Sequence, residues 1–272
     1  MKNFFNEKVV VITGSSMGIG KSLAQLLGSQ KAKIVMNARN AEKLADSCLE
    51  LQALGYNVIA CEGDVTLAAD CTKLIDAAIR HFGKIDILVN NAGVGMRGAI
   101  ATITPGVISS IFNVNAIAPI LLTQVALPHI KESKGSIIFI SSLAGLRGLP
   151  FLSIYSAAKM SLTAFAQALR AEHHHDKIHI GLVYVGITQI NEGKTAIGSD
   201  GKPVLLAHRK EGILTETIDQ VAVKIASNIS SKKKQTIIGL AGKAFYFLIR
   251  YTPGLFEFLL LRSQKRINKL YK

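Results

Sequence analysis

The 272-residue sequence predicts an α/β fold: a doubly wound, mostly seven-stranded parallel sheet in a single domain with a C-terminal helical extension. Short β-branched runs alternate with longer stretches of helical periodicity, which is the pattern of repeated strand–helix–strand units. Most of the short runs are apolar throughout, as expected for strands that helices cover on both faces. A glycine-rich turn follows the first run, and such turns lie at the ligand-binding edge of doubly wound sheets.

The elements follow one another without a repeat or a low-complexity linker. The expected strands are residues 8–13, 32–37, 57–62, 85–90, 135–141, 179–184 and 235–239. Helical length and apolar spacing predict helices at residues 20–30, 42–54, 68–82, 105–130 and 155–175. Residues 187–209 predict a long loop at the carboxyl edge of the sheet, where it would cover a substrate. We therefore expect one domain over residues 1–239 and an extension over residues 240–272.

Composition narrows the class of protein. With 49% hydrophobic and 18% charged residues, the chain is neither disordered nor collagen-like. The N-terminal residues lack the apolar core and cleavage site of a signal peptide, so we expect no cleaved leader. Three scattered cysteines favour a reducing compartment and a cytoplasmic location. We expect no metal, because three consecutive histidines, residues 173–175, point in different directions on a helix.

The positive charge gathers near the C-terminus. The chain has a net charge of +14, and residues 209–272 contribute 13 Lys or Arg against 4 Asp or Glu. Nucleic acid is not an expected partner, because only 6% of residues are aromatic and no recognition motif is present. Residues 240–272 alternate apolar clusters with basic residues, as interfacial helices do. This extension either touches the inner face of a membrane peripherally or packs on protein, and both interpretations stay open.

The glycine turn, TGSSMGIG at residues 13–20, lies between the first strand and the first helix. Its glycines at positions 14, 18 and 20 allow a tight turn and a close approach of backbone amides to a pyrophosphate at the helix N-terminus. This position indicates a dinucleotide-binding, Rossmann-type sheet. A purely structural turn is the alternative.

Two strand ends indicate the cofactor. The second strand ends in NARN, where an acidic residue would bind the adenosine ribose and a basic one accommodates a 2′-phosphate. Arg39 therefore favours NADP(H) over NAD(H), unless it is only a solvated surface charge. Asp64, at the end of the third strand, is suited to accept a hydrogen bond from the adenine amino group. Its alternative role is a helix cap.

The strongest candidate constellation is Ser142, Tyr155 and Lys159. Tyr155 and Lys159 are four residues apart on a helical pattern, so their side chains share one face. An ammonium beside a phenol favours the phenolate and is expected to lower the tyrosine pKa. Ser142 follows the fifth strand, at the edge where a substrate would lie. The three residues predict a proton donor and a group that binds the reacting oxygen.

In this order the motifs resemble those of the short-chain dehydrogenase/reductase family. The match covers about residues 7–240 and comprises TGSSMGIG, Asp64, NNAG at residues 90–93, Asn115, SSLAG containing Ser142, and YSAAK. The resemblance implies that Tyr155 donates a proton to a carbonyl while a hydride arrives from the nicotinamide. Lys159 would lower the tyrosine pKa and bind the nicotinamide ribose, Ser142 would orient the carbonyl, and Asn115 would hold a water in the proton relay.

The glycine turn, the strand ends and the resemblance together give a set of expected cofactor contacts. These are Gly14, Ser16, Gly18, Ile19, Gly20, Arg39, Asp64, Val65, Asn91, Ala92, Gly93, Tyr155, Lys159, Gly186 and Thr188.

The sequence departs from the family pattern in two places. After the sixth strand it reads YVGITQI, with Val185 where members usually have Pro and Ile190 where they have Thr. Thr188 is the expected substitute for contacts to the nicotinamide carboxamide. NADP-preferring members often carry a basic residue in the glycine turn, where this chain has Met17. The NADP preference therefore depends mainly on Arg39.

The sequence thus predicts an NADP-dependent oxidoreductase that acts on the carbonyl or alcohol of a small hydrophobic or lipid-like substrate. The tail is similar to that of a lipid-active branch resembling acyl-dihydroxyacetone-phosphate reductases. The alternatives are a 3-oxoacyl thioester reductase and a non-catalytic NADP-binding sensor. The resemblance also implies a homodimer or homotetramer.

Overall fold

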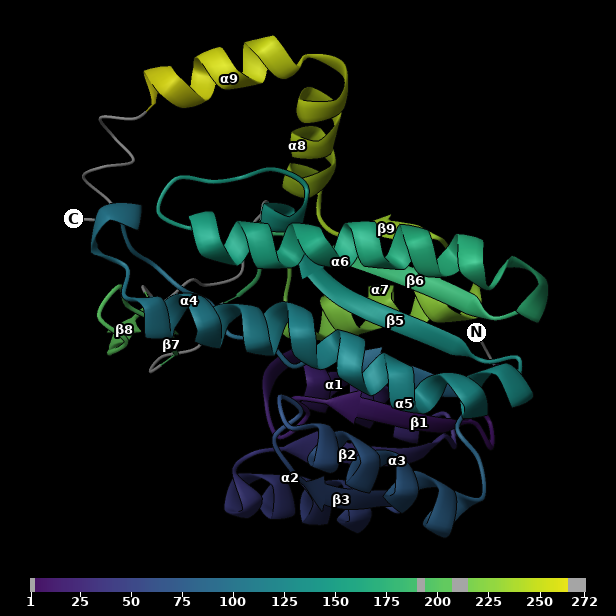
Figure 1. Cartoon of the computed structure of the whole chain (residues 1–272). Helices are drawn as coiled ribbons and strands as arrows, with labels where there is room; N and C mark the ends of the chain where they lie inside the picture. The colour runs from purple at the N-terminus through teal and green to yellow at the C-terminus, as the bar shows by residue number, and fades with distance from the viewer. Residues whose placement is uncertain (1–2, 190–193, 207–214, 264–272) are drawn as a thin grey trace.

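The computed structural model describes residues 3–189, 194–206 and 215–263 (Figure 1). Parallel strands form one seven-stranded sheet in the order β3-β2-β1-β4-β5-β6-β9, which confirms the predicted fold. The strands are β1 (Val9–Thr13), β2 (Lys33–Ala38), β3 (Val58–Glu62), β4 (Ile87–Asn90), β5 (Ser136–Ser142), β6 (His179–Val185) and β9 (Gln235–Ile237). The strand order reverses between β1 and β4, and ligands of open α/β sheets bind at such a reversal.

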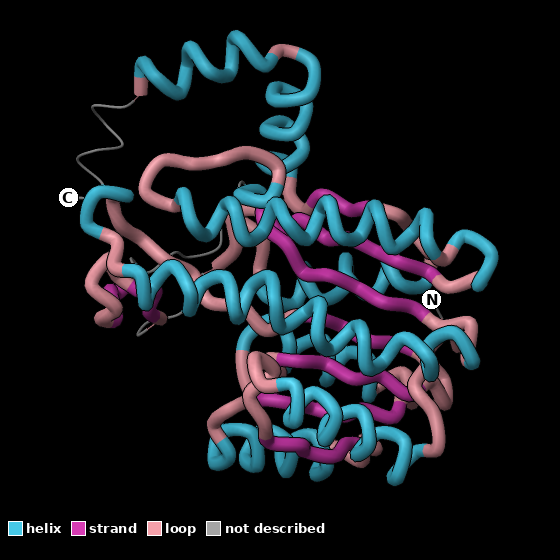
Figure 2. Tube along the Cα trace, viewed as in Figure 1, coloured by secondary structure: helices cyan, strands magenta, loops and turns pink. Residues whose placement is uncertain are grey.

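Helices cover both faces of the sheet (Figures 1 and 2). One face carries α1 (Gly18–Gly28), α2 (Ala41–Ala53) and α7 (Ile218–Ser230), and the other carries α3 (Ala68–Phe82), α5 (Ala118–Glu132) and α6 (Ser153–Glu172). Helix α7 is not among the helices expected from the sequence. Its N-terminus has a reciprocal cap between Thr217 and Gln220, each side chain bonding the other's backbone N–H.

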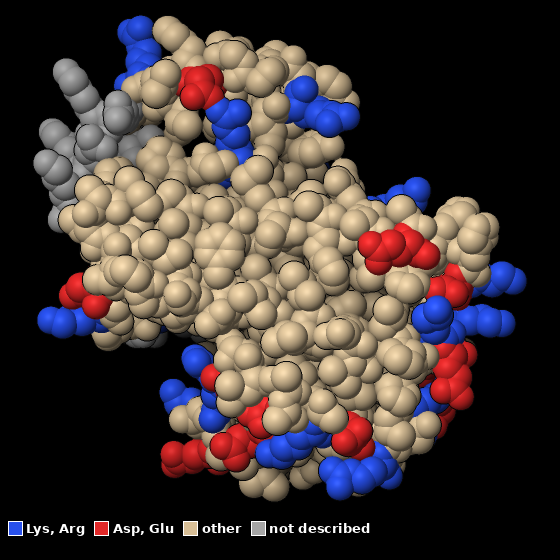
Figure 3. All heavy atoms as spheres, viewed as in Figure 1, with Lys and Arg blue, Asp and Glu red and all other residues tan. Residues whose placement is uncertain are grey.

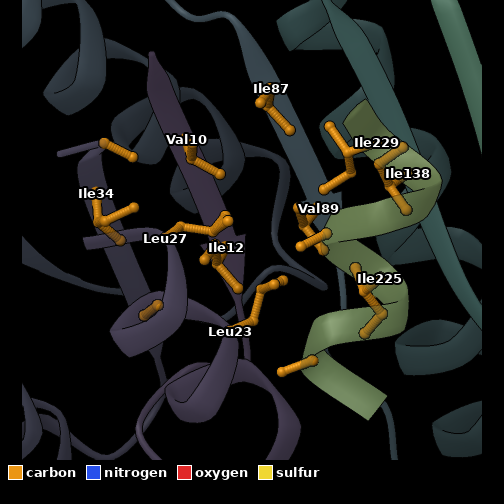
Figure 4. Packing of buried hydrophobic residues seen from close by; sticks show 14 of the residues in the cluster. Val10, Ile12, Leu23, Leu27, Ile34, Ile87, Val89, Ile138, Ile225 and Ile229 are labelled. Carbon is orange, nitrogen blue, oxygen red and sulfur yellow. The ribbon is translucent and has the colours of Figure 1, made fainter. Parts of the chain in front are cut away.

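The alternation of side chains along each strand produces two separate cores. Val10 and Ile12 of β1 pack against α1 and α7, whereas Val11 between them faces α3 and α5. Figure 4 shows the first of these cores, where Leu23 of α1 and Ile225 of α7 approach the same strands. Because both faces of each central strand are buried, the strands are apolar without interruption, as the sequence indicated.

The helix expected at residues 105–130 contains a π-helical turn. Helix α4 (Pro105–Phe112) passes through this turn (Asn113–Ile117) into α5 without a break. The turn carries Asn115, and π-helical turns are frequent at functional sites. The combined helix is also the one long helix in the described part of the chain that is apolar enough to span a membrane, but half of its most apolar window is buried inside the fold.

The loop predicted at residues 187–209 is not wholly irregular. Its described part contains two short antiparallel strands, β7 (Thr195–Ile197) and β8 (Pro203–Leu205). Ile197 also bridges to Met96, which ties this hairpin to the segment after β4. The prediction missed the hairpin because three-residue strands leave almost no period-two pattern to detect.

The C-terminal extension forms two helices, α8 (Leu240–Tyr251) and α9 (Pro253–Arg262), which we call the C-terminal pair. The seventh strand ends earlier than expected because Gly239, with a φ of 86°, turns the chain into α8. The two helices meet at an angle of 115°. Figure 1 shows α8 rising from the sheet beside β9 and α9 turning back over the loop between β5 and α6. The basic end of the tail, residues 264–272, lies outside the described residues.

Candidate active site

Two glycines of the turn after β1 occupy places that no side chain could share. A Cβ on Gly14 would lie 2.9 Å from the Cα of Ala92, and one on Gly20 would lie 2.3 Å from the carbonyl oxygen of Gly14. Gly18 instead has open space around it and is required by its φ of 58°, in the left-handed region. Close packing and backbone conformation therefore both select glycine in this turn.

The segment after β4 holds the turn in place. The side-chain amide of Asn91 donates to the carbonyl oxygens of Thr13 (2.8 Å) and Gly14 (2.9 Å). In return, the hydroxyl of Thr13 accepts hydrogen bonds from the backbone N–H groups of Asn91 (3.0 Å) and Ala92 (2.9 Å). The sequence predicts Thr13 as the last residue of the first strand and the first of the glycine turn. Its role in joining the two segments emerges from the three-dimensional contacts.

The glycine turn after β1, which we call the glycine cradle, fits the phosphate groups of a dinucleotide. Helix α1 begins at Gly18 with Met17 as its N-cap, and no side chain caps its first N–H groups. Uncapped N–H groups at a helix N-terminus attract anions, and the glycines before them leave the backbone accessible. The expected contacts Ser16 and Ile19 belong to the same turn, and the Ser16 carbonyl accepts a hydrogen bond from Ser47 (2.7 Å).

Arg39 and Asp64 lie together at the ends of β2 and β3. A guanidinium nitrogen of Arg39 is 3.7 Å from a carboxylate oxygen of Asp64, and the Arg39 side chain is 63% exposed. Burial alone would raise the pKa of Asp64, but hydrogen bonds from Thr66 and the charge of Arg39 outweigh burial, so this pKa is lowered. Asp64 does not cap the next helix, because it binds Thr66 and α3 begins after Leu67. Val65 beside it is buried.

Three of the predicted catalytic residues converge from two elements. Ser142 ends β5, and Tyr155 and Lys159 lie on α6. The Ser142 side chain is near enough to the Tyr155 hydroxyl to oppose the rise of its pKa on burial, and the Lys159 ammonium lies 6.0 Å from the centroid of the Tyr155 ring. The Lys159 Nζ donates to the carbonyl oxygen of Ile140 at 3.0 Å. This hydrogen bond fixes the lysine side chain near the carboxyl end of β5.

Asn115 completes the group through the π-helical turn. Its side-chain amide donates to the carbonyl oxygens of Val94 (2.9 Å) and Ile111 (3.0 Å), and its Oδ1 accepts from the Val94 N–H (3.2 Å). Gly93 lies between this amide and Lys159, since a Cβ there would be 2.9 Å from Asn115 Oδ1 and 3.3 Å from Lys159 Nζ. The structure therefore brings together all four residues predicted for catalysis.

Burial sets the protonation of this group. Burial raises the pKa of Tyr155, and the hydrogen bond from Ser142 only partly opposes that rise. Burial lowers the pKa of Lys159 to about 8. The expectation that the lysine depresses the pKa of the tyrosine is therefore not met in this structure. The physical reason is that removal from water penalises the phenolate and the ammonium alike.

The segment after β6 is only partly described. A Cβ on Gly186 would lie 2.5 Å from the carbonyl oxygen of Ile238, so the close approach of β6 to the chain after β9 requires glycine there. The Thr188 hydroxyl donates to the Gly186 carbonyl at 3.2 Å, and Thr188 bridges to Glu216. Ile190, the other departure from the family pattern, lies outside the described residues.

No group of three His, Cys, Asp or Glu side chains that could hold a metal occurs within residues 3–189, 194–206 and 215–263. Of the three consecutive histidines, His173 pairs with Asp176 through Nδ1 at 2.6 Å.

A parallel sheet with a glycine cradle at its reversal point and a Tyr–Lys pair beside a serine defines a dinucleotide-dependent oxidoreductase of the Rossmann type. The family model for short chain dehydrogenases matches residues 8–200. The chain therefore belongs to the short-chain dehydrogenase/reductase family and is an enzyme of that class.

Several known proteins are similar to this chain. It is 33% identical to dehydrogenase/reductase SDR family member 7B of Bos taurus, over 100% of this chain and 86% of that protein. A solved short-chain dehydrogenase/reductase of Burkholderia phymatum in complex with NAD is 25% identical, with a TM-score of 0.76 over 85% of this chain and 88% of its own. A metagenomic short-chain oxidoreductase in complex with NADP is 28% identical, with a TM-score of 0.68 over 83% and 91%.

Proposed function

We propose that this protein reduces the carbonyl group of a small hydrophobic or lipid-like substrate with NADPH. The observation that carries this proposal is the convergence of Ser142, Tyr155, Lys159 and Asn115 beside the glycine cradle. A nicotinamide cofactor bound there supplies the hydride. Every other step is performed by side chains of this chain.

Tyr155 is the proposed proton donor. Because burial raises its pKa, the hydroxyl is protonated at neutral pH and ready to donate to a carbonyl oxygen. Ser142, whose side chain lies near the Tyr155 hydroxyl, binds the same oxygen and orients it. Lys159, whose ammonium lies 6.0 Å from the centroid of the tyrosine ring, is the proposed contact for the nicotinamide ribose. Asn115 holds the π-helical turn against Val94 and supports the proton relay.

Replacement of Tyr155 by Phe tests the proposal. Loss of a positioned proton donor costs about a hundred- to ten-thousandfold in rate, so Tyr155→Phe should lose nearly all turnover of an accepted ketone. NADPH affinity should stay unchanged, because the cradle is untouched. A non-catalytic NADP-binding sensor would show no turnover in the wild-type protein and no effect of this substitution on its output, which would contradict the proposal.

NADPH is the proposed cofactor on the basis of Arg39. Solved relatives at similar sequence distance hold NAD in one case and NADP in the other, so family membership leaves the choice to local chemistry. Arg39 is exposed, and its 3.7 Å ion pair with Asp64 is loose enough for a 2′-phosphate to replace the carboxylate. Cofactor fluorescence titration of wild type and Arg39→Ala tests this. We expect NADPH to bind about tenfold more weakly to the variant, with NADH unaffected.

A hydrophobic substrate is proposed because the C-terminal pair adds exposed apolar side chains near the loop between β5 and α6, which joins Ser142 to the helix of Tyr155. Phe247 (58%), Leu255 (51%) and Phe258 (56%) are among its exposed residues. The competing substrate class is a 3-oxoacyl thioester, the alternative that the sequence leaves open. A screen of ketones with NADPH, including long-chain ketones and an acetoacetyl thioester, separates the two by kcat/KM.

The same pair supports a peripheral contact with the inner face of a membrane, and with it a cytoplasmic location. Its exposed apolar residues accompany Lys243, Arg250 and Arg262, and the remaining basic residues of the tail lie outside the described residues. Apolar and basic residues on short helices favour binding at the surface of an anionic bilayer.

A homodimer or homotetramer is the proposed assembly. Figure 3 shows that the surface over α4, α5 and α6 is almost free of charged side chains, whereas Lys, Arg, Asp and Glu crowd the surface over α2 and α3. Ile117, Ile120 and Met160, which belong to α5, α6 and the π-helical turn, are exposed. A second copy of the chain is the proposed occupant, and light scattering of the purified protein tests it.

A further inference from the structure

The loop between β5 and α6 joins the two halves of the catalytic group. This substrate loop, residues 146–152, begins shortly after Ser142 and ends at Leu152, the N-cap of the helix that carries Tyr155. It is held to its surroundings by backbone contacts. The Leu149 N–H donates to the Ser156 hydroxyl (3.3 Å), and the Phe151 carbonyl accepts from Gly98 (3.0 Å).

The substrate loop is held in a demanding conformation. Phe151 has a φ of 60°, in the left-handed region that bulky side chains rarely adopt. Such a conformation persists only when neighbouring contacts fix it. A change in what holds this loop therefore changes the placement of the residues at its two ends.

Arg147 connects the substrate loop to the C-terminal pair. Its guanidinium forms an ion pair with Glu257 of α9 and lies 5.7 Å from the centroid of the Phe256 ring. Phe256 in turn packs edge-on against Phe245 of α8, with ring centroids 5.2 Å apart. Arg147 of the substrate loop thus contacts α9 directly, and it is connected to α8 through the ring of Phe256.

The base of α8 forms a second attachment to the same region. A Cβ on Gly242 would lie 3.3 Å from a methyl carbon of Leu143, the residue directly after Ser142. The C-terminal pair is therefore attached at two points that follow the catalytic serine, at Leu143 and at Arg147. Figure 1 shows the resulting arrangement, with α9 above the substrate loop.

The charge pattern of the tail is consistent with this attachment. Glu257 is the one acidic residue after position 239, against seven Lys or Arg. Among the described residues it pairs with Arg147 of the substrate loop. Because both side chains are partly exposed, the ion pair between Arg147 and Glu257 is weak by itself. The Phe256 ring beside the guanidinium adds a cation–π contact to it.

We propose that Arg147 is a specificity-determining residue, because it holds α9 over the substrate loop. In this position the C-terminal pair forms one wall of the substrate entrance. That wall receives the apolar chain of a long-chain carbonyl substrate. This inference rests on the proposed carbonyl reductase function. Short ketones, which end within reach of Ser142 and Tyr155, do not need this wall.

The test compares butanone with dodecanone in an NADPH oxidation assay on the full-length chain. In Arg147→Met, which keeps much of the side chain's apolar stem, kcat/KM for dodecanone should fall about tenfold, corresponding to about 1.4 kcal/mol. The loss should lie mainly in KM, and kcat/KM for butanone should stay within about twofold. Arg250→Met is the matched control, since Arg250 lies on α8 and forms no ion pair among the described residues.

The charge-reversed pair provides the rescue. Arg147→Glu alone should lose dodecanone selectivity, and adding Glu257→Arg should recover a large part of it. Equal losses for butanone and dodecanone in Arg147→Met would overturn the proposal, because they would place Arg147 in the chemistry or in general stability. A selective loss of dodecanone turnover in Arg250→Met would overturn it as well.

Hydrogen–deuterium exchange gives a measurement that does not depend on activity. In Arg147→Met, amides of the substrate loop and of α9 should both exchange faster than in wild type, while those of α1 should not change. Unchanged exchange in the loop would show that the C-terminal pair is not held through Arg147, whatever the ketone assay gives. If no ketone is reduced but exchange responds as expected, the attachment stands and the proposed reductase function fails.

Discussion

Burial of two neighbouring side chains, Tyr155 and Lys159, determines the protonation state of each. Removal from water raises the pKa of the phenol and lowers that of the ammonium to about 8. The tyrosine is therefore kept as an acid, while the lysine retains its charge at neutral pH but loses it within the mildly alkaline range. A reductase needs its tyrosine protonated at the start of the reaction, and these environments provide that state.

The buried lysine makes a prediction about stability. The pKa of Lys159 is about 8 in the folded protein and 10.5 when the side chain is surrounded by water, so the unfolded chain binds more protons between these values. The free energy of unfolding should therefore rise with pH across that window, by an amount on the order of 3 kcal/mol from this residue. Lys159→Met should remove the rise. Urea denaturation at neutral pH and near the upper end of the window measures it, and parallel pH profiles for the two proteins would contradict the prediction.

At the scale of elements, the π-helical turn between α4 and α5 positions a catalytic amide. In a regular α-helix the Ile111 carbonyl would accept the backbone N–H of residue 115, whereas here it accepts a hydrogen bond from the side-chain amide of Asn115. Here Asn115 is fully buried and joins the turn to Val94, in the segment after β4. The element thus couples the helix to the same segment that holds the glycine turn.

Asn115→Ala should be costly for this reason. It would leave the Val94 N–H and carbonyl groups without their partners in a partly buried place, which costs about 1 to 2 kcal/mol of unfolding free energy. Catalytic turnover should fall as well, because Gly93 and Lys159 pack beside this amide. Asn113→Ala, at an exposed position of the same turn, is the control and should change unfolding by less than about 0.5 kcal/mol in urea titrations.

In the whole molecule, the C-terminal pair lies outside the three layers that the sheet and its two sets of covering helices form. The two cores of the sheet are closed by helices that precede the pair, so α8 and α9 are not needed to cover them. The pair adds a projecting surface near the active-site edge, where Figure 3 shows basic and acidic side chains among uncharged ones. Its position allows a single feature to serve both substrate entry and contact with a lipid surface.

Vesicle binding tests the membrane contact. The double variant Leu255→Ser/Leu261→Ser, on α9, should bind vesicles containing phosphatidylglycerol at least about tenfold more weakly than wild type, because each exposed leucine contributes apolar area. Leu49→Ser/Leu54→Ser, at equally exposed leucines of the α2 region, is the matched control and should bind as wild type does. Equal binding by all three proteins would argue against the tail as the contact.

Most of the sheet could be predicted from the sequence, and the failures of prediction have identifiable causes. Strands buried on both faces are continuous apolar runs, so β1, β2 and β5 were readable without any contact information. The hairpin of β7 and β8 was not, because short exposed strands are defined by pairing and not by composition. The π-helical turn was also invisible, since one extra residue in a helical turn barely disturbs the apolar spacing around Asn115.

By itself the sequence determined the fold class, the glycine turn and the group of Ser142, Tyr155 and Lys159, because periodicity and motif spacing are local properties of the chain, and the resemblance to the short-chain dehydrogenase/reductase family added Asn115. Only the tertiary structure decided the protonation of Tyr155 and Lys159, the loose pairing of Arg39 with Asp64 and the attachment of α9 through Arg147. Each of these depends on burial or on contacts between distant segments. Desolvation and pairing energies are set by the complete packed environment, which no stretch of sequence contains.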